Sequence, residues 1–154
     1  MLYQAQLNRK GHSIREEYGG DAANLPEIKN HYYDAVLVFG PLYHLPREDR
    51  QKVIQESKRI CKTGGIILFA YINKVGAYLR ACIDENLKSR YPNKKANESV
   101  LKQGVDDILP DVFFFTMPEE MESDVTENGL AVVNNAGVDF AFNASNHAVL
   151  VCRK

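Results

Sequence analysis

The sequence predicts one α/β domain whose sheet is mostly parallel and ends in an antiparallel pair of strands. Two observations lead to this fold class. Residues 33–73 run from a short apolar strand through a charged amphipathic helix to a second apolar strand, which is the pattern of a βαβ crossover. The last two apolar strands are separated only by residues 136–146, a link too short for a parallel crossover, so we expect them to run antiparallel.

The composition is that of an ordinary globular domain and excludes several classes of function. The chain has 154 residues, of which 45% are hydrophobic and 25% are charged. A formal net charge of -1 is unlike that of proteins that bind nucleic acid or anionic membranes. No apolar run has the length of a membrane span, and residues 1–10 lack a signal-peptide core, so we expect a soluble, cytoplasmic protein.

The sequence gives little sign of a metal site; Asp106, Asp107 and Asp111 could coordinate a cation, but a solvated acidic loop explains them better. The three cysteines are unclustered and lie in apolar patterns, which favours buried free thiols: Cys61, Cys82 and Cys152. The histidines likewise show no spacing typical of metal ligation. We therefore expect no metal site.

The crossover begins with Asp34–Phe39, a run so short and so uniformly apolar that it predicts a parallel strand with both faces buried. Gly40 and Pro41 end this strand. In the helix that follows, Pro46 occupies the first turn, and acidic residues near the start and basic residues near the end suit the helix dipole.

The end of that helix leads into the second strand of the crossover. The apolar face of the helix is expected to hold Val53, Ile54, Ile60 and Cys61. Gly64 is expected to end the helix in a left-handed conformation. Ile66–Ile72 is then the second buried strand.

The segments before and after the crossover give weaker patterns. Leu2–Lys10 predicts a short helix and His12–Tyr18 a brief strand, followed by a turn-rich loop at residues 19–25. After the crossover, Lys74–Arg90 predicts an amphipathic helix whose apolar stripe is Val75, Leu79, Cys82, Ile83 and Leu87. Residues 92–112 are polar and irregular, with one short helix around Glu98–Lys102, and we interpret them as a lid or insertion.

The C-terminal part predicts one more helix and the antiparallel strands. Thr116 and Glu119 have the spacing of a capping box, and Asn128-Gly129 is expected to end the helix. The two strands are Leu130–Asn135 and His147–Cys152. An apolar run, Phe113-Phe114-Phe115, precedes the helix; it suits the core better than stacking on an aromatic substrate.

Four segments together resemble class I S-adenosylmethionine-dependent methyltransferases: Gly-Asp-Ala at 20–22, residues 33–44, Lys-Thr-Gly-Gly at 62–65, and residues 116–120. The resemblance runs from about Tyr18 to Lys154. It implies a Rossmann-like sheet of order 3-2-1-4-5-7-6, with strand 7 antiparallel and helices on both faces. It also implies S-adenosylmethionine as cofactor and methyl transfer as the reaction.

By this resemblance, Asp21 and Ala22 correspond to the pair that reads adenine. The Asp21 carboxylate would accept from the exocyclic amine, and the Ala22 backbone N–H would donate to the ring. The end of the strand beside the methionine part of the cofactor corresponds to Phe39, Gly40 and Pro41. That position also suits open α/β sheets in general, whose ligands bind beyond the carboxyl ends of the strands.

Tyr43 and His44 would face the acceptor and position or deprotonate it. Simpler interpretations remain open for several of these residues. Gly40-Pro41 is also a common strand-ending turn, Asp21 is a common turn-former, and His44 suits a surface position before a helix.

Two parts of the family's cofactor site are missing from the sequence. The chain contains no Gly-x-Gly for the turn after the first strand, and no carboxylate after a second strand to hold the ribose. We therefore expect a methyltransferase domain without its first two strands. The bare edge of Asp34–Phe39 would then pair either with His12–Tyr18 or with a second copy of the chain, and we expect a homodimer.

Three functions are compatible with the sequence. The first, which we favour, is methyl transfer to a small-molecule acceptor whose identity the sequence does not reveal. The second is a non-catalytic methyltransferase remnant that acts as a binding or interaction module. The third is another kind of nucleotide-binding α/β protein, against which the absent glycine-rich phosphate loop argues.

Overall fold

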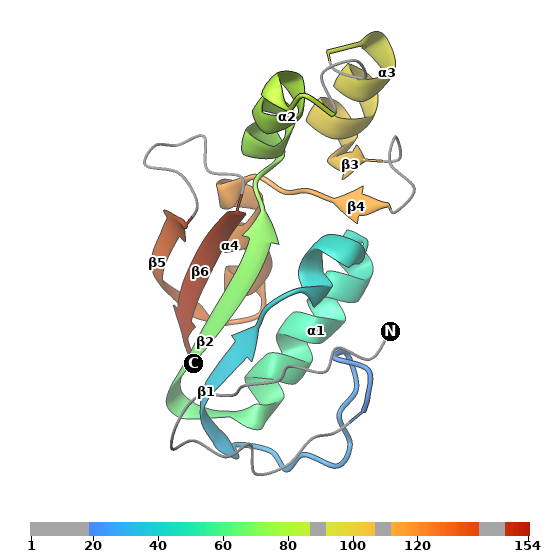
Figure 1. Ribbon diagram of the computed structural model, residues 1–154. Coiled ribbons are helices and arrows are strands. Elements are labelled where there is room, and N and C mark those ends of the chain that lie inside the picture. The colour runs from blue at the N-terminus through green and yellow to red at the C-terminus, as the bar shows by residue number, and fades with distance from the viewer. Residues whose placement is uncertain (1–18, 87–91, 107–111, 139–146) are drawn as a thin grey trace, which may run out of the picture.

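The computed structural model describes residues 19–86, 92–106, 112–138 and 147–154 (Figure 1). Four strands form one sheet in the order β1-β2-β6-β5: β1 (Tyr33–Val38), β2 (Cys61–Ile72), β6 (His147–Arg153) and β5 (Ala131–Gly137). β1 and β2 are parallel, whereas β6 is antiparallel to both β2 and β5. The mixed sheet is therefore confirmed, and its order corresponds to strands 4-5-7-6 of the order that the resemblance implies.

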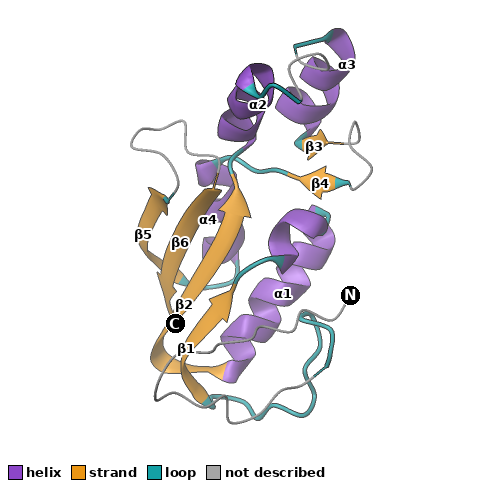
Figure 2. Cartoon of the chain, viewed as in Figure 1, coloured by secondary structure: helices purple, strands orange, loops and turns teal. Residues whose placement is uncertain are grey.

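The larger helices lie between these strands along the chain. They are α1 (Arg47–Ile60), α2 (Lys74–Ile83) and α4 (Pro118–Glu127). Beyond the carboxyl end of β2, several small elements gather next to α2 (Figure 2): α3 (Lys94–Ala96), η2 (Asn97–Gln103), β3 (Val105–Asp106) and β4 (Phe113–Phe114). Among the described helices, none is long and apolar enough to cross a membrane. The expected segments Leu2–Lys10 and His12–Tyr18 lie outside the described residues.

The hydrophobic core lies on one face of the sheet, between the strands and helices α1 and α4. The strands contribute Val38, Ile67, Phe69, Tyr71, Ala148, Leu150 and Cys152, and the helices contribute Val53, Ile54, Met121 and Val125. On the other face, Leu37 is 62% exposed and Ile66 is 39% exposed. The expectation that both faces of the first strand are buried is therefore wrong, because β1 is an edge strand and the described helices pack on only one of its faces.

The junction between α1 and β2 also differs from the prediction. Cys61 already has extended backbone, with φ -74° and ψ 139°, so the helix ends at Ile60 and no left-handed residue is needed to end it. Gly64 instead lies within β2, where its N–H donates to the Lys154 carbonyl at 2.8 Å. At Gly65 a side chain is excluded, because a Cβ would lie 2.7 Å from Cys61 Sγ and 2.8 Å from the Asp34 carbonyl oxygen.

Helix α2 is present, but its buried face is not the predicted one. It ends at Ile83, and its buried residues are Gly76, Tyr78 and Ala81. The predicted apolar stripe is largely exposed, with Leu79 at 48% and Ile83 at 75%. The neighbouring η2, not the main sheet, covers α2, and this tertiary contact selects the face that is buried.

The start of α4 is stabilised by a capping box shifted by one residue from the predicted one. The carboxylate of Glu120, not Glu119, accepts from the Met117 N–H at 2.8 Å and from the Thr116 hydroxyl at 3.0 Å. The predicted end at Asn128-Gly129 is confirmed, and Gly129 has a φ of 70°. Burial opposes ionisation of Glu120, but these hydrogen bonds and the nearby cations hold its pKa below the usual value.

We predict that Leu150→Ala lowers the free energy of unfolding by about 2–5 kcal/mol, because Leu150 is fully buried beneath the helices. Leu79→Ala is the matched control: the same atoms are removed from a half-exposed position, and the loss should stay within about 0.5 kcal/mol. Urea unfolding measures both values. Equal losses would contradict the one-sided core.

A second prediction about folding stability concerns Gly40. It follows β1 with φ 118° and ψ -47°, a conformation that side-chain-bearing residues avoid, although a Cβ there would have room, with Tyr43 Oη at 3.7 Å. Gly40→Ala should therefore cost about 1–3 kcal/mol of folding free energy through backbone strain alone. Gly20→Ala, at a glycine without positive φ, is the control and should change stability by less than about 0.5 kcal/mol in urea unfolding.

Candidate functional site

The carboxyl ends of the parallel strands β1 and β2 lie at the same end of the sheet, where α/β proteins place their ligands. β1 leads into Phe39, Gly40 and the short helix η1 (Pro41–His44). Phe39 is 57% exposed, so an apolar ring is presented at this end. The positive φ of Gly40 turns the chain here and leaves its backbone without a side chain.

Tyr43 and His44 lie in one aromatic cluster with the segment that precedes α4. The ring centroids of Tyr43 and His44 are 4.7 Å apart, and the His44 ring is 5.2 Å from that of Phe113. Phe113 in turn stacks on Phe115, with centroids 6.3 Å apart and planes at 20°. The phenylalanine run is half-buried: Phe115 packs against the small core cluster between α2 and η2, and Phe113 lies beside the two predicted acceptor-facing residues.

The structure does not bring Asp21 to this end. Its carboxylate accepts from the Ala23 N–H at 3.0 Å, and its carbonyl accepts from Asn24, so it forms a local turn. The loop is attached to the C-terminal half of α1, where the Leu25 N–H donates to Glu56 and the Leu25 carbonyl accepts from Arg59. Phe39–His44, in contrast, precede the N-terminal end of that helix.

The described residues fit only one part of S-adenosylmethionine. Gly40 and Phe39 suit the methionine end, where a backbone must approach closely and a ring can pack. The predicted adenine pair, Asp21 and Ala22, lies elsewhere along α1, and the chain has no Gly-x-Gly turn. These residues alone therefore do not hold the whole cofactor.

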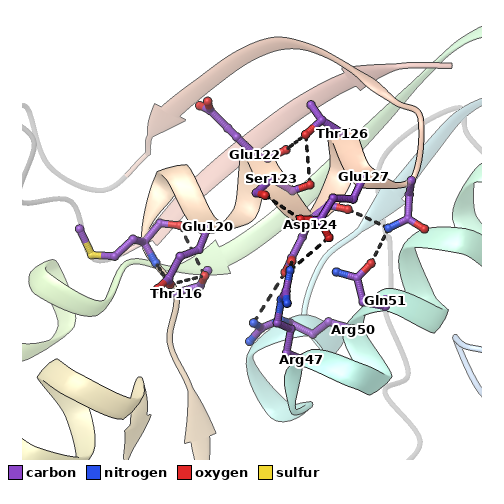
Figure 3. Close-up of polar contacts among 12 residues, drawn as sticks. Arg47, Arg50, Gln51, Thr116, Glu120, Glu122, Ser123, Asp124, Thr126 and Glu127 are labelled. Carbon is purple, nitrogen blue, oxygen red and sulfur yellow. Dashed lines mark hydrogen bonds and ion pairs between the residues drawn. The ribbon is translucent and has the colours of Figure 1, made fainter.

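Sequence reasoning missed a group of charged residues between α1 and α4 (Figure 3). Arg47 and Arg50 both extend from α1 toward Asp124 on α4, whose side chain is only 1% exposed. Arg50 is buried as well, and burial lowers its pKa. A signal was available, because Arg50 shares a helical face with Val53, Ile54 and Ser57, all of them buried.

The arginines border a pocket of about 530 Å³. Its other walls come from the start of α2, the end of η2, β4 with Phe115, and α4. Phe115 therefore belongs both to the aromatic cluster and to the pocket. Among the described residues, no group of three or more His, Cys, Asp and Glu side chains could hold a metal ion.

Comparison with known proteins identifies the fold. Residues 1–69 match the family described as Methyltransferase domain, whereas no curated protein matches the chain in sequence. A SAM-dependent methyltransferase from Methanosarcina mazei superposes with a TM-score of 0.69 at 14% identity, over 98% of this chain and 72% of that one. The CcbJ methyltransferase from Streptomyces caelestis gives 0.60 at 15% identity, over 87% of this chain and 65% of that one.

A third similar structure was solved with a product of the cofactor. It is 1,6-didemethyltoxoflavin-N1-methyltransferase from Burkholderia thailandensis with bound 1,6-didemethyltoxoflavin and S-adenosylhomocysteine. It superposes with a TM-score of 0.56 at 9% identity, over 86% of this chain and 48% of that one. Our chain thus spans between 48% and 72% of the length of these three structures. The chain resembles the S-adenosylmethionine-dependent methyltransferases in its Rossmann-like fold, and its first 69 residues match a methyltransferase domain in sequence.

Proposed function

We propose that this chain forms the acceptor side of an S-adenosylmethionine-dependent methyltransferase that acts on a small molecule. The observation that supports this proposal most is an aromatic cluster at the carboxyl end of β1. Tyr43 and His44, which follow Gly40 closely in sequence, form this cluster with Phe113. Ligands of open α/β sheets bind at this position. The fold and the family match of residues 1–69 support methyl transfer as the chemistry.

The proposed roles follow from the side chains. The cofactor, when bound, supplies a methyl group on a sulfonium. Tyr43 and His44 would orient the acceptor, and either could take its proton, so most of the rate would come from alignment. Phe39, Gly40 and Pro41 would lie along the methionine end, with Asp21 and Ala22 as the proposed adenine pair.

Residues 92–112 are our proposed lid or insertion. Their described part packs next to the site: β3 pairs with β4 in the register Val105 with Phe114, and η2 packs on α2. The segment is thus attached to the same aromatic strand that borders Tyr43 and His44. We also propose a cytoplasmic location, which the three free thiols support because reducing compartments keep cysteines unpaired.

We predict that the chain binds S-adenosylhomocysteine weakly, as measured by isothermal titration calorimetry. Losing even two charge-assisted hydrogen bonds of the glycine-rich turn and ribose site would cost about 3–6 kcal/mol, or about two to four decades of affinity. If the loop that holds Asp21 reaches the cofactor, Asp21→Ala should remove the binding that remains without unfolding the chain. A dissociation constant in the low micromolar range would contradict the proposed half-site, and unchanged affinity of Asp21→Ala would contradict the adenine pair.

We further propose that the chain forms a homodimer through the edge of β1. In the described part of the chain β1 pairs only with β2, so no described strand pairs with its second edge. Leu37 and Phe39 also present apolar side chains beside that edge, and these residues are 62% and 57% exposed. An edge of this kind is a template for pairing with another strand, and a second copy supplies one by two-fold symmetry.

Leu37→Lys tests this interface, because a charge beside an edge strand opposes strand pairing. We expect the unchanged chain to be a dimer at micromolar concentration by size exclusion with light scattering, and Leu37→Lys to be a monomer. Val133→Lys is the matched control on β5, the opposite edge strand, where Val133 is 55% exposed; it should remain dimeric. A monomeric unchanged chain would refute the dimer, and a dimeric Leu37→Lys would place it on another surface.

A further inference from the structure

The pocket between α1, α2, η2 and α4 has an unusual lining. Four of its lining residues are cations, from three different helices: Arg47, Arg50, Lys74 and Lys102. Glu120 is its one acidic lining residue among those described. Three other carboxylates form ion pairs with these cations but do not line the pocket: Asp124, Glu127 and Glu98.

Arg50 is the most informative member. Its side chain is 9% exposed, and its Nε has no hydrogen-bond partner. Its nearest carboxylate oxygen, Asp124 Oδ2, is 3.8 Å from Nη2, beyond hydrogen-bond distance, and that oxygen is unpartnered as well. Asp124 makes its short contact with Arg47, at 2.8 Å from Nε. The positive charge of Arg50 therefore lacks a close ion pair, and an anion in the pocket that Arg50 lines would compensate it.

Two further features favour an anion at this place. The ammonium of Lys74, on a side chain only 12% exposed, is 3.8 Å from Glu120, so it too is held near a carboxylate without a close contact. Pro46 and Arg47 bring the N-terminal end of α1 to the pocket, and no side chain caps that end. The positive end of the helix dipole therefore adds to the charge of the side chains, although Glu48 and Asp49 in the first turn offset part of it.

We propose that this pocket binds the anionic group, a carboxylate or a phosphate, of the methyl acceptor. The preference for an anion follows from the residues of the pocket; the assignment of that anion to the acceptor rests on the function proposed above. Phe115 links the two places, since it lines the pocket and stacks on Phe113 beside Tyr43 and His44. An acceptor anchored by its charge would thus have its apolar part next to the aromatic cluster.

The anion site can be tested without the cofactor. The ¹⁵N-labelled full chain is titrated with inorganic phosphate and, separately, with acetate at constant ionic strength, while the Nε–Hε resonance of Arg50 is followed by NMR. A saturable shift with either probe is expected, and the probe that binds more tightly identifies the group as phosphate or carboxylate. Absence of a saturable shift with both probes would overturn the proposal.

Lys74→Gln and Lys52→Gln form a matched pair of variants. Both remove one positive charge, but Lys52 is 62% exposed and does not line the pocket. Lys74→Gln should weaken binding of the better probe about tenfold, as expected for one lost charged hydrogen bond, and Lys52→Gln should leave it unchanged. Equal weakening in both variants would mean general charge attraction and would overturn the site.

The link to the acceptor has a separate readout. If the chain binds phosphate or acetate but a methyltransferase assay with anionic small molecules, run with S-adenosylmethionine above the weak dissociation constant predicted for this chain, yields no methylated product in any oligomeric state, the acceptor assignment is overturned. Product formed from an anionic molecule, and reduced in Lys74→Gln but not in Lys52→Gln, supports it. The failure of the anion site and the failure of the proposed function are thus distinguishable.

Discussion

Strand β2 is the element on which the rest of the structure depends. It is paired on both edges, with β1 in parallel and with β6 antiparallel, and its inward side chains Ile67, Phe69 and Tyr71 form the middle of the core. Burial of such side chains is the main favourable term in folding. Because β2 follows α1 without a loop and leads directly to α2, it also sets where the end of the sheet and the adjoining pocket lie.

Close backbone approach at the start of β2 is the second constraint. Gly65 permits the approach of Cys61 and Asp34, and Lys154 completes the junction from the opposite end of the chain. The Lys154 ammonium also donates to the carbonyls of Lys58 and Cys61, at 2.6 and 2.7 Å, where α1 ends. The last residue thus satisfies carbonyl groups that a helix end leaves without partners.

The site and the pocket owe their positions to packing between segments far apart in sequence. Phe113 meets Tyr43 and His44 across about seventy residues because β4 crosses beside η1. Arg47 and Asp124 meet because α1 and α4 share one face of the sheet. Asp124 forms a short ion pair with Arg47, whereas its ion pair with the buried Arg50 is long. The positive charge of Arg50 is therefore incompletely balanced, and this makes the pocket suited to an anion.

The sequence by itself determined the mixed sheet, the crossover and the antiparallel terminal pair, because apolar periodicity and link length are local properties. It also marked Gly40 as the end of β1 and Asn128-Gly129 as the end of α4, since left-handed or turn conformations favour those residue types. Only the tertiary structure decided which faces are buried. Leu37 and Leu79 are as apolar as Leu150, yet they remain exposed because no described element packs over them, whereas the charged Arg50 is buried because α4 covers it.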